Sequence, residues 1–426
     1  MKNLWKKLIG WTLCLMMAVG MLSVAAREAK AADTDAGAGE GIVWNDEKDY
    51  YEISSYAGLL EFAAIVNGTS AQGETNSAAN AKIVVEKIDA SASNPDNSGY
   101  DDQTTAWTPI GNYDNPYTGT FDGNGCTIKG LTIESTGNYI GLFGYVGKDG
   151  CVQNVNLEGE SIKGHYLVGG VAGFNGGKVS NCYNTCEARG SSEVGGVVGW
   201  NNGGISNCYN TGKVEGNSDV GGVVGVNNGT VSNCYNTGKI GRENIIGGVV
   251  GWNNGGISNC YNTGDVEGNI HVGGVVGWNN GGIGISNCYN TGAVNGSKEY
   301  VGGVVGINDT KSKVSNCYNT GVVNGSGSEV GGVAGYNDGT VSNCYYNQST
   351  CQKGAINGSD DGENNVRGLT TAEMTGINAM DALTGFEDEN GKSEWIVREN
   401  SLDTYYYPHL KGFAYDTTGD VKDWPA

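Results

Sequence analysis

The stretch VGGVVGWNNGGISNCYNTG, residues 194–212, recurs with small changes from about residue 168 to residue 346. Each copy has an apolar-Gly-Gly-Val-apolar-Gly run, a turn, a Ser-Asn-Cys-Tyr segment and a short variable stretch. Each glycine of these pairs would destabilise a helix interior by about 1 kcal/mol relative to Ala. Short Val, Ile and Tyr runs bounded by Gly and Asn are instead typical of β-strands. The copies follow one another at spacings of 26, 26, 26, 28, 29 and 27 residues, counted between Cys182, Cys208, Cys234, Cys260, Cys288, Cys317 and Cys344.

A repeat of this length predicts a solenoid. One copy cannot bury its apolar face alone, but stacked copies can, with backbone hydrogen bonds between neighbours about 4.8 Å apart. We therefore predict an all-β chain that forms a single-stranded parallel β-helix, with one coil per copy. The usual handedness of parallel crossovers predicts a right-handed winding. Because the ends of a solenoid need covers, we expect a short N-terminal capping helix and a small C-terminal cap.

Stacking turns each position of the repeat into a column. A bulky, mostly aromatic column follows the first run, and next to it comes an invariant asparagine column. Buried asparagine side chains can bond amide to amide along such a column, and asparagine also tolerates the left-handed backbone of a coil corner. A second asparagine column precedes the cysteines. The three columns are Tyr145, Phe174, Trp200, Val226, Trp252, Trp278, Ile307 and Tyr336; Asn175, Asn201, Asn227, Asn253, Asn279, Asn308 and Asn337; and Asn181, Asn207, Asn233, Asn259, Asn287, Asn316 and Asn343.

The repeated cysteines fit a buried apolar column. Aligning the degenerate earlier copies places Val155 and Leu131 at the cysteine position, and a site shared by Leu, Val and Cys suits a small buried side chain. Disulfides between coils stay open as an alternative, because the coil spacing permits them and the chain carries an export signal. The remaining cysteines of the coils and C-terminal segment are expected outside this column; they are Cys126, Cys151, Cys186 and Cys351.

The chain divides into five segments by composition. Residues 1–31 have basic, apolar and small-residue regions in the order of a secretory signal peptide, and 32–41 form a flexible leader. Residues 42–104 form an N-terminal cap, with a helix near 54–66 that buries Leu59, Phe62, Ala63 and Val66. Residues 105–350 form the coils, and 351–426 form a loop and a C-terminal cap, where Thr370 and Glu373 make a capping box for a helix through about Leu383.

The charge excludes several partners. The formal charge of −21 argues against nucleic acid and anionic membranes as ligands. No second long apolar run follows the signal peptide, so we expect no transmembrane segment in the mature chain. We expect no cofactor and no metal site, although oxygen-rich turns at 121–125, 336–340 and 358–365 leave calcium open.

Candidate catalytic groups are few. The three histidines, His165, His271 and His409, are widely spaced and none belongs to a His-Glu-x-x-His motif. The acidic residues lie in the variable turns, and the irregular coils at 281–286 and 308–315 gather no acids and bases. We therefore expect a protein without enzymatic activity or catalytic residues. A polysaccharide-acting β-helix enzyme, a lyase or a glycosidase, is the alternative.

The tyrosine after each repeated cysteine is the candidate ligand-binding residue. If strand alternation holds, tyrosine and cysteine face opposite ways, so buried cysteines leave an exposed tyrosine strip. Such a strip could stack on sugar rings or contact a partner protein; the alternative is packing between coils that only stabilises the sheet. The strip consists of Tyr183, Tyr209, Tyr235, Tyr261, Tyr289, Tyr318 and Tyr345.

The chain resembles the GLUG-motif repeat proteins of bacterial surfaces. The resemblance rests on YEISSYAGLLEFAAIVNG (51–68), WTPIGNYDNPYTGTFDGNGCTIKGL (107–131), YIGLFGYVG (139–147), the Val-Gly-Gly-Val copies and the closing WIVRENSLDTYYYPHLKG (395–412). Such repeats occur in adhesin-like proteins and beside the catalytic part of some immunoglobulin-A-cleaving metallopeptidases. The resemblance implies a secreted or cell-surface protein that binds surface glycans or extracellular proteins, or acts as a spacer. It defines no catalytic residue.

Overall fold

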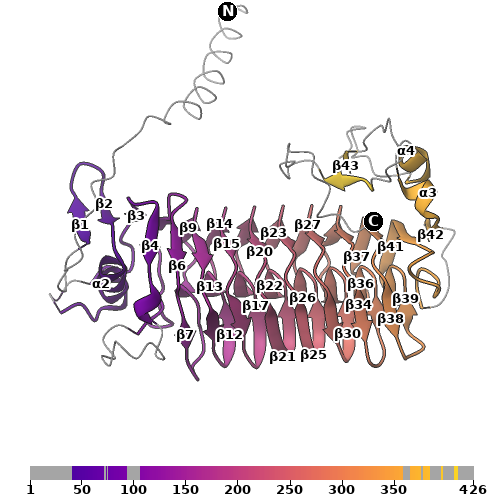
Figure 1. Ribbon diagram of the computed structural model, residues 1–426, viewed down its shortest axis with the longest axis horizontal. Coiled ribbons are helices and arrows are strands. Elements are labelled where there is room, and N and C mark those ends of the chain that lie inside the picture. Colours follow the sequence, from indigo (N-terminus) through magenta and orange to yellow (C-terminus); the bar gives the residue numbers. More distant parts are fainter. Residues whose placement is uncertain are drawn as a thin grey trace, which may run out of the picture. The chain divides into compact units, whose positions relative to one another are not determined.

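The computed structural model describes residues 41–71, 73, 75–93, 106–357, 365–375, 378–383, 395–396 and 407–410. The expected signal peptide and nearly all of the expected leader lie outside these residues. The described chain winds into a parallel β-solenoid, as the repeat predicts (Figure 1). The right-handed sense of the winding stays a prediction.

The opening stretch of sequence forms most of one coil. Its strands are β17 (Ser192–Gly195), β18 (Val198–Asn201), β19 (Gly204–Ser206), β20 (Tyr209–Asn210) and β21 (Val214–Gly221). They belong to three sheets, in which these strands pair in parallel with the neighbouring coils. We call them sheet A (with β19 and β20), sheet B (with β18) and sheet C (with β17 and β21). In sheet B, Trp200 pairs with Val226 one coil further on. Each repeat position therefore becomes a column, as predicted.

Sheet B contains one strand from each coil. Its other strands are β8 (Phe143–Val146), β13 (Ala172–Asn175), β22 (Val224–Asn227), β26 (Val250–Asn253), β31 (Val276–Asn279), β36 (Val305–Asn308) and β40 (Ala334–Asn337). Sheet C contains the strands that the variable stretches of the repeat form. Its other strands are β7 (Ile133–Glu134), β11 (Ser161–Lys163), β12 (Tyr166–Gly169), β16 (Glu187–Arg189), β25 (Ile240–Gly247), β29 (Val266–Gly268), β30 (Ile270–Gly273), β34 (Val294–Gly296), β35 (Val301–Gly302), β38 (Val323–Gly325) and β39 (Val330–Gly331).

Sheet A is the largest sheet and continues beyond the repeats at both ends. Its other strands are β1 (Ile42–Asn45), β2 (Tyr50–Ile53), β3 (Ala81–Ile83), β4 (Lys87–Asp89), β5 (Thr120–Asp122), β6 (Thr127–Lys129), β9 (Cys151–Gln153), β10 (Asn156–Glu158), β14 (Lys178–Ser180), β15 (Tyr183–Asn184), β23 (Thr230–Ser232), β24 (Tyr235–Asn236), β27 (Gly256–Ser258), β28 (Tyr261–Asn262), β32 (Gly284–Ser286), β33 (Tyr289–Asn290), β37 (Lys313–Asn319), β41 (Thr340–Asn347) and β42 (Val366–Leu369).

The N-terminal segment covers the first coils and also belongs to the solenoid. Helix α2 (Tyr56–Asn67) begins at Ser55, whose side chain accepts a hydrogen bond from the Gly58 amide, and ends at Gly68 in the left-handed region. The predicted apolar face is buried, with Leu59, Phe62 and Val66 at 0% exposure. Strand β2 pairs in parallel with β3, and β3 with β5. Sheet A therefore starts within the segment that the sequence assigned to the cap; a short 3-10 turn, η1 (Ser91–Ser93), follows β4.

The C-terminal segment contains short elements. Helix α3 (Thr371–Met374) begins with the predicted capping box between Thr370 and Glu373. Thr375 is extended, with φ −128° and ψ 154°, so α3 ends there and α4 (Asn378–Ala382) is separate. A single helix through Leu383 was therefore wrong. Strands β43 (Trp395–Ile396) and β44 (His409–Leu410) form a small antiparallel pair.

The first predicted asparagine column is a buried ladder. Each side chain from Asn175 onward donates its amide to the next asparagine at 2.7–2.8 Å. Its backbone is not left-handed; the left-handed residues are the second predicted column, such as Asn207 at φ 55°. That column lies at coil corners near the surface, and some of its amides bond at 3.1–3.3 Å. The left-handed conformation thus belongs to the second column, because the corner precedes the cysteine.

A further buried ladder escaped the sequence analysis. The asparagines after the tyrosines are fully buried and bond to one another at 2.8–3.0 Å. The second glycine of each Val-Gly-Gly-Val run faces this ladder, since a Cβ at Gly196 would lie 2.3 Å from Asn210 Cγ. The repeated glycine therefore leaves room for a buried amide. The ladder consists of Asn184, Asn210, Asn236, Asn262, Asn290 and Asn319.

The repeated cysteines are buried free thiols. All seven are 0% exposed, and no disulfide joins any cysteine of the described chain. Their thiols donate to the serine carbonyl two residues earlier, as Cys234 does to Ser232 at 3.2 Å. The alignment of Leu131 with this column was wrong. Asn156 pairs with Thr127, which puts Cys126 beside Val155 and therefore inside the column. Four residues separate β5 from β6, whereas two separate β9 from β10, so the longer turn shifts the true register away from the alignment.

Candidate ligand-binding surfaces

Six of the seven candidate tyrosines form a stacked ladder on the outer face of sheet A, and Tyr345 continues the same column in register with Tyr318. Tyr209 and Tyr235 pair in register, with ring centroids 4.7 Å apart and planes 5° apart. The stacking continues from Tyr183 to Tyr318 at 4.7–5.0 Å. The adjacent cysteines point into the core, so the predicted opposition of tyrosine and cysteine is observed. The stacking itself is the packing between coils that was the alternative reading of this column.

Exposure of the tyrosine ladder falls towards the C-terminus. Tyr183 and Tyr209 are half-buried, whereas Tyr289, Tyr318 and Tyr345 are at most 1% exposed. The C-terminal segment packs over these last positions, which Figure 1 shows as the gold elements beside β37 and β41. The ring of Trp395 lies 5.3 Å from that of Tyr318, whose hydroxyl donates to the Pro408 carbonyl at 2.5 Å. Only the N-terminal part of the predicted strip therefore contributes partly exposed rings.

Ring edges and hydroxyls, rather than ring faces, form the surface of the ladder. Parallel rings less than 5 Å apart leave no space for a sugar ring between them. The Tyr183 hydroxyl donates to Glu158 Oε1 at 3.2 Å. Burial raises the pKa of Tyr209, and it raises the pKa of Tyr235 to about 12, so the hydroxyls stay protonated donors at neutral pH. The ladder can offer a ligand a row of regularly spaced hydroxyl groups.

The aromatic column of sheet B also faces outward. Trp252 and Trp278 stack at 5.2 Å with planes 7° apart. Trp200 and Trp252 donate their indole N–H groups to Asn202 and Asn254, at 2.8 and 3.1 Å. These indoles therefore have partners within the solenoid.

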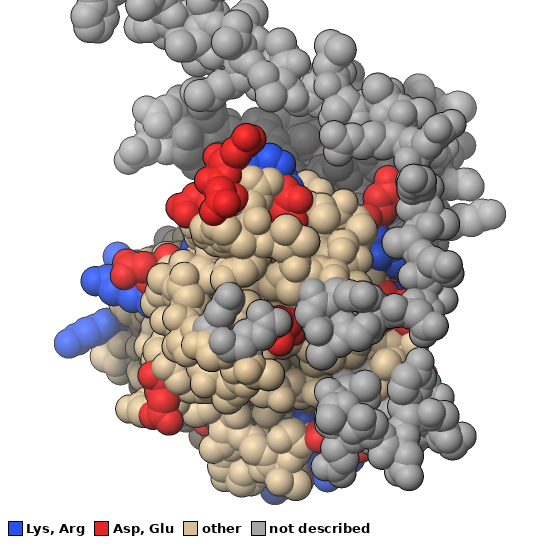
Figure 2. All heavy atoms as spheres, turned by 90° about the vertical axis from the view of Figure 1, so that its left-hand side faces the viewer, with Lys and Arg blue, Asp and Glu red and all other residues tan. Residues whose placement is uncertain are grey.

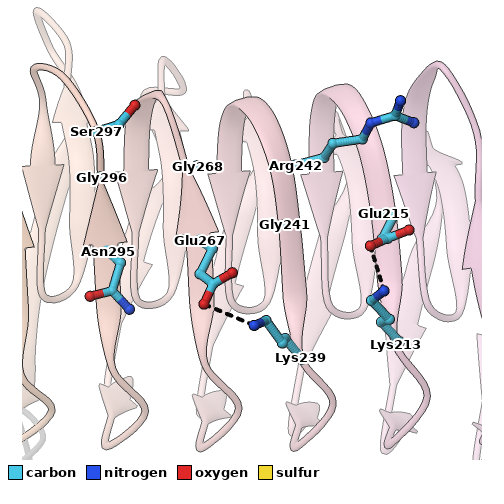
Figure 3. A pocket seen from close by; sticks show the side chains of 10 residues that line it. All are labelled: Lys213, Glu215, Lys239, Gly241, Arg242, Glu267, Gly268, Asn295, Gly296 and Ser297. Carbon is cyan, nitrogen blue, oxygen red and sulfur yellow. Dashed lines mark hydrogen bonds and ion pairs between the residues drawn. The ribbon is translucent and has the colours of Figure 1, made fainter.

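A groove on sheet C is the hollow that the sequence analysis missed. It has a volume of about 410 Å³ and crosses several coils (Figure 3). Its lining contains glycines and polar or charged side chains without a large apolar one. We call it the sheet C groove, and its side chains are Lys213, Glu215, Lys239, Arg242, Glu267, Asn295 and Ser297.

The sequence does carry a signal for this groove. The coils on either side contain Glu215-Gly216 and Glu267-Gly268, whereas the coil between them contains Gly241-Arg242. The register pairs Glu215 with Gly241 and Gly241 with Glu267. The order of glycine and side chain is thus reversed in one coil, an irregularity that was overlooked beside the longer insertions at 281–286 and 308–315.

Ion pairs organise the charges of the groove. Lys213 Nζ lies 2.5 Å from Glu215 Oε1, and Lys239 Nζ lies 2.8 Å from Glu267 Oε1. The hydrogen bond from Lys213 and the nearby charges lower the pKa of Glu215 despite its partial burial. The Glu215 carboxylate therefore remains ionised and paired at neutral pH. This arrangement suits binding better than proton donation to a leaving group, which needs a carboxyl with a raised pKa.

The other candidate residues are dispersed. His165 precedes β12, His271 lies in β30 and His409 lies in β44. Within the residues that the structure describes, no three His, Cys, Asp or Glu side chains gather around a possible metal position. Asp122, in the first oxygen-rich turn, accepts hydrogen bonds from the Asn124 amide and the Asn154 side chain, both at 2.8 Å. Figure 2 shows Asp and Glu side chains scattered over the N-terminal end.

The described chain has no helix with the length and apolar character that a membrane crossing requires.

Comparisons with known proteins give short sequence matches and a partial match to a solved structure. The family model of the GLUG motif matches residues 190–215, 243–267 and 298–324. Halomucin of Haloquadratum walsbyi is 36% identical over 133 residues, which are 31% of this chain and 1% of the relative. A protein of Evansella cellulosilytica described as a Gly-rich membrane protein is 44% identical over 79 residues, or 18% of this chain and 9% of the relative. The chain thus spans a small part of both curated relatives.

A crystal structure from Bacteroides ovatus, of a protein described as an immunoglobulin A1 protease, has a similar arrangement. The superposition covers 85% of this chain and 92% of that chain, with 18% sequence identity and a TM-score of 0.45.

Proposed function

We propose that this chain, which carries the GLUG motif in at least three of its coils, acts as a surface-associated repeat protein without enzymatic activity. Its role in this proposal is to bind an extracellular glycan or protein on the outer face of sheet A. The names of its matched relatives, a halomucin and a Gly-rich membrane protein, support a surface location. The expected signal peptide supports export of the chain.

The partly exposed tyrosine ladder is the observation that carries this proposal. Tyr183 and Tyr209 present ring edges and hydroxyls in a fixed row, with neighbouring rings 4.9 Å apart. Such a rigid aromatic row costs little conformational entropy when a ligand binds, because stacking already fixes each ring. The far end of the same row is covered by the chain's own C-terminal segment. The face is therefore chemically suited to contact with another polar and aromatic surface.

Binding to a combined array of glycans and extracellular-matrix proteins tests the proposal. The protein is applied with and without calcium, and any saturable signal is repeated with the double variant Tyr183→Ala and Tyr209→Ala. We expect a saturable hit that the double variant weakens by about tenfold or more, since aromatic positions dominate many interfaces. Trp252→Ala, on the outer face of sheet B, is the matched control and should leave the signal unchanged.

Three results would contradict the proposal. A signal that persists in the tyrosine variant would move the ligand to another face of the solenoid. An array without any signal would favour a structural spacer. Release of oligosaccharide products from a polysaccharide panel would support the alternative of a β-helix enzyme.

A further inference from the structure

One position of sheet C breaks the pattern of the repeat. Arg242 occupies a column in which the neighbouring coils have glycine, since it pairs with Gly216 and the column continues as Gly268 and Gly296. Its φ angle is 150°, in the region that favours glycine. Holding a residue larger than glycine there strains the backbone. A strained residue in an otherwise regular sheet points to a function for its side chain.

The same break leaves bare backbone in the groove. Gly241 lies in register between Glu215 and Glu267, in the column that carries side chains on the adjacent coils. A Cβ at Gly241 would lie 2.6 Å from the Glu267 carbonyl oxygen, so this coil presents bare backbone here, and Gly241, Gly268 and Gly296 together line the sheet C groove. A ligand can therefore approach the backbone closely between the two glutamates.

Positive charge exceeds negative charge in this groove. Glu215 is paired with Lys213 at 2.5 Å, and Arg189 Nε lies 3.9 Å from its other oxygen. Figure 3 shows the exposed Arg242 side chain extending from its strand towards the coil that carries Glu215. Lys239 is satisfied by Glu267. No ion pair of Arg242 is found among the described residues, so its guanidinium is available although the whole chain has a formal charge of −21.

We propose that the sheet C groove binds an acidic polysaccharide, with the Arg242 guanidinium holding a carboxylate of a uronic acid residue. A guanidinium offers two parallel donors that match a carboxylate. Asn295 and Ser297 line the same groove. Asn295 Oδ1 accepts from Asn324 and Ser297 Oγ donates to Asn269, both at 2.9 Å, which leaves the Asn295 amide to donate to a sugar hydroxyl and the Ser297 oxygen to accept from one. The lack of large apolar lining residues favours a hydroxyl-rich chain over a protein partner, whose binding usually depends on aromatic or aliphatic anchors. This site lies on a different sheet from the tyrosine ladder and does not depend on ligand binding there.

Titration with hexagalacturonate and with its methyl-esterified form tests this site by calorimetry on the purified full chain. Arg242→Gly restores the glycine of the column, so it should fold at least as well as the parent. Arg242→Gln keeps the backbone conformation and removes only the charge. We expect both variants to weaken hexagalacturonate binding about tenfold or more, the effect of losing a charge-assisted hydrogen bond. Lys178→Gln, an exposed lysine of sheet A, is the charge-matched control and should bind like the parent.

The expected binding weakens as salt increases, because exposed charges are screened, and the esterified hexamer should not bind. Equal binding of acidic and esterified hexamers would overturn the proposal, as would parental affinity in Arg242→Gln. Binding of poly-glutamate without binding of hexagalacturonate would replace the polysaccharide with an acidic protein segment. A protein that binds none of these probes would also refute the site.

Discussion

Buried amides are the residues that hold successive coils together. Asn236 accepts hydrogen bonds from Asn210 at 2.9 Å and from the Gly238 amide at 3.2 Å. It donates to the Gly238 carbonyl at 2.7 Å and to Asn262 at 2.8 Å. The amide nitrogen of Asn236 therefore donates two hydrogen bonds within the core, and its amide oxygen accepts two. Because buried polar groups are costly only when unpaired, the continuous ladder makes the buried asparagines tolerable.

Removing one amide from the ladder should destabilise the folded protein. We expect Asn236→Ala to lower the free energy of unfolding by about 3 kcal/mol, because it leaves buried donors and acceptors on both neighbours unpaired. Urea denaturation followed by circular dichroism measures the change. The control is Asn228→Ala, from an exposed row of asparagines that bond at the surface. A cost for Asn236→Ala no larger than for Asn228→Ala would contradict this role.

A buried carboxyl at a coil corner makes stability depend on pH. Burial raises the pKa of Asp219, while hydrogen bonds from Ser218 and Ser192 act in the opposite direction. An acid whose folded pKa is raised binds its proton more tightly in the folded state. Its stabilising contribution is present below the unfolded pKa and is lost as pH rises through the folded pKa.

Asp219→Asn should therefore stabilise the protein at pH 7 and change little at pH 3. The asparagine oxygen can still accept from Ser192 and Ser218, which now donate at 3.1 and 3.0 Å. Thermal midpoints measured from pH 3 to pH 7 for both proteins give the comparison. A stabilisation that is equal across the range would mean that ionisation of Asp219 is not responsible.

At the scale of elements, the C-terminal segment uses the tyrosine ladder as its docking surface. Leu369, Met374, Trp395 and Leu410 form an apolar cluster with the last tyrosines of the ladder. These elements are too short to be stable alone, so contact with sheet A must hold them in place. The coils, by contrast, pair with neighbours on both sides and need no such support.

Tyr318→Ala should detach this segment without unfolding the solenoid. The change removes the hydrogen bond to Pro408 and the ring contact with Trp395. We expect limited proteolysis to cut within 370–410 much faster in the variant, while its β-sheet circular dichroism stays the same. Tyr209→Ala removes an equivalent ring outside the apolar cluster and serves as control. Equal cleavage of all three proteins would show that the docking does not depend on Tyr318.

At the scale of the whole molecule, regular coils should be interchangeable. Each coil contacts its neighbours through the same columns, so the stability of a solenoid is close to a sum over coils and their interfaces. Residues 222–247 form one period of the sequence, and deleting them would join Gly221 to Gly248 and recreate the Val-Gly-Gly-Val run. Val220 already pairs with Ile246, so both ends of the deletion occupy the same place in the coil.

We expect the 222–247 deletion to fold into a shorter solenoid with the same β-sheet spectrum and a cooperative melt. Small-angle X-ray scattering should report a length reduced by about 5 Å, one strand spacing. Deleting residues 222–234, half a period, should give an unfolded or aggregated product because every column is then out of register. Similar behaviour of the two deletions would contradict the modular account. The longer deletion also removes Arg242 and should abolish binding in the sheet C groove.

The sequence by itself determined the solenoid, because a repeat of constant length forces equivalent residues into columns, whatever the details of a coil. The same argument correctly predicted the Asn175 ladder and the buried cysteines, and the apolar spacing of 54–66 correctly predicted the buried face of α2. It could not align the degenerate coils, where Cys126 rather than Leu131 joins the cysteine column, since a turn of different length shifts the register without changing the apolar pattern.

Only the tertiary structure decided which columns face solvent and what covers them. Three of the seven tyrosines are buried by a segment distant in sequence, which no local periodicity encodes. The sheet C groove likewise depends on Gly241 lying between Glu215 and Glu267, residues that are neighbours only because adjacent coils pair in register. Contacts within a coil follow from the order of residues, whereas surfaces arise from the relation between coils and from the segments that pack on them.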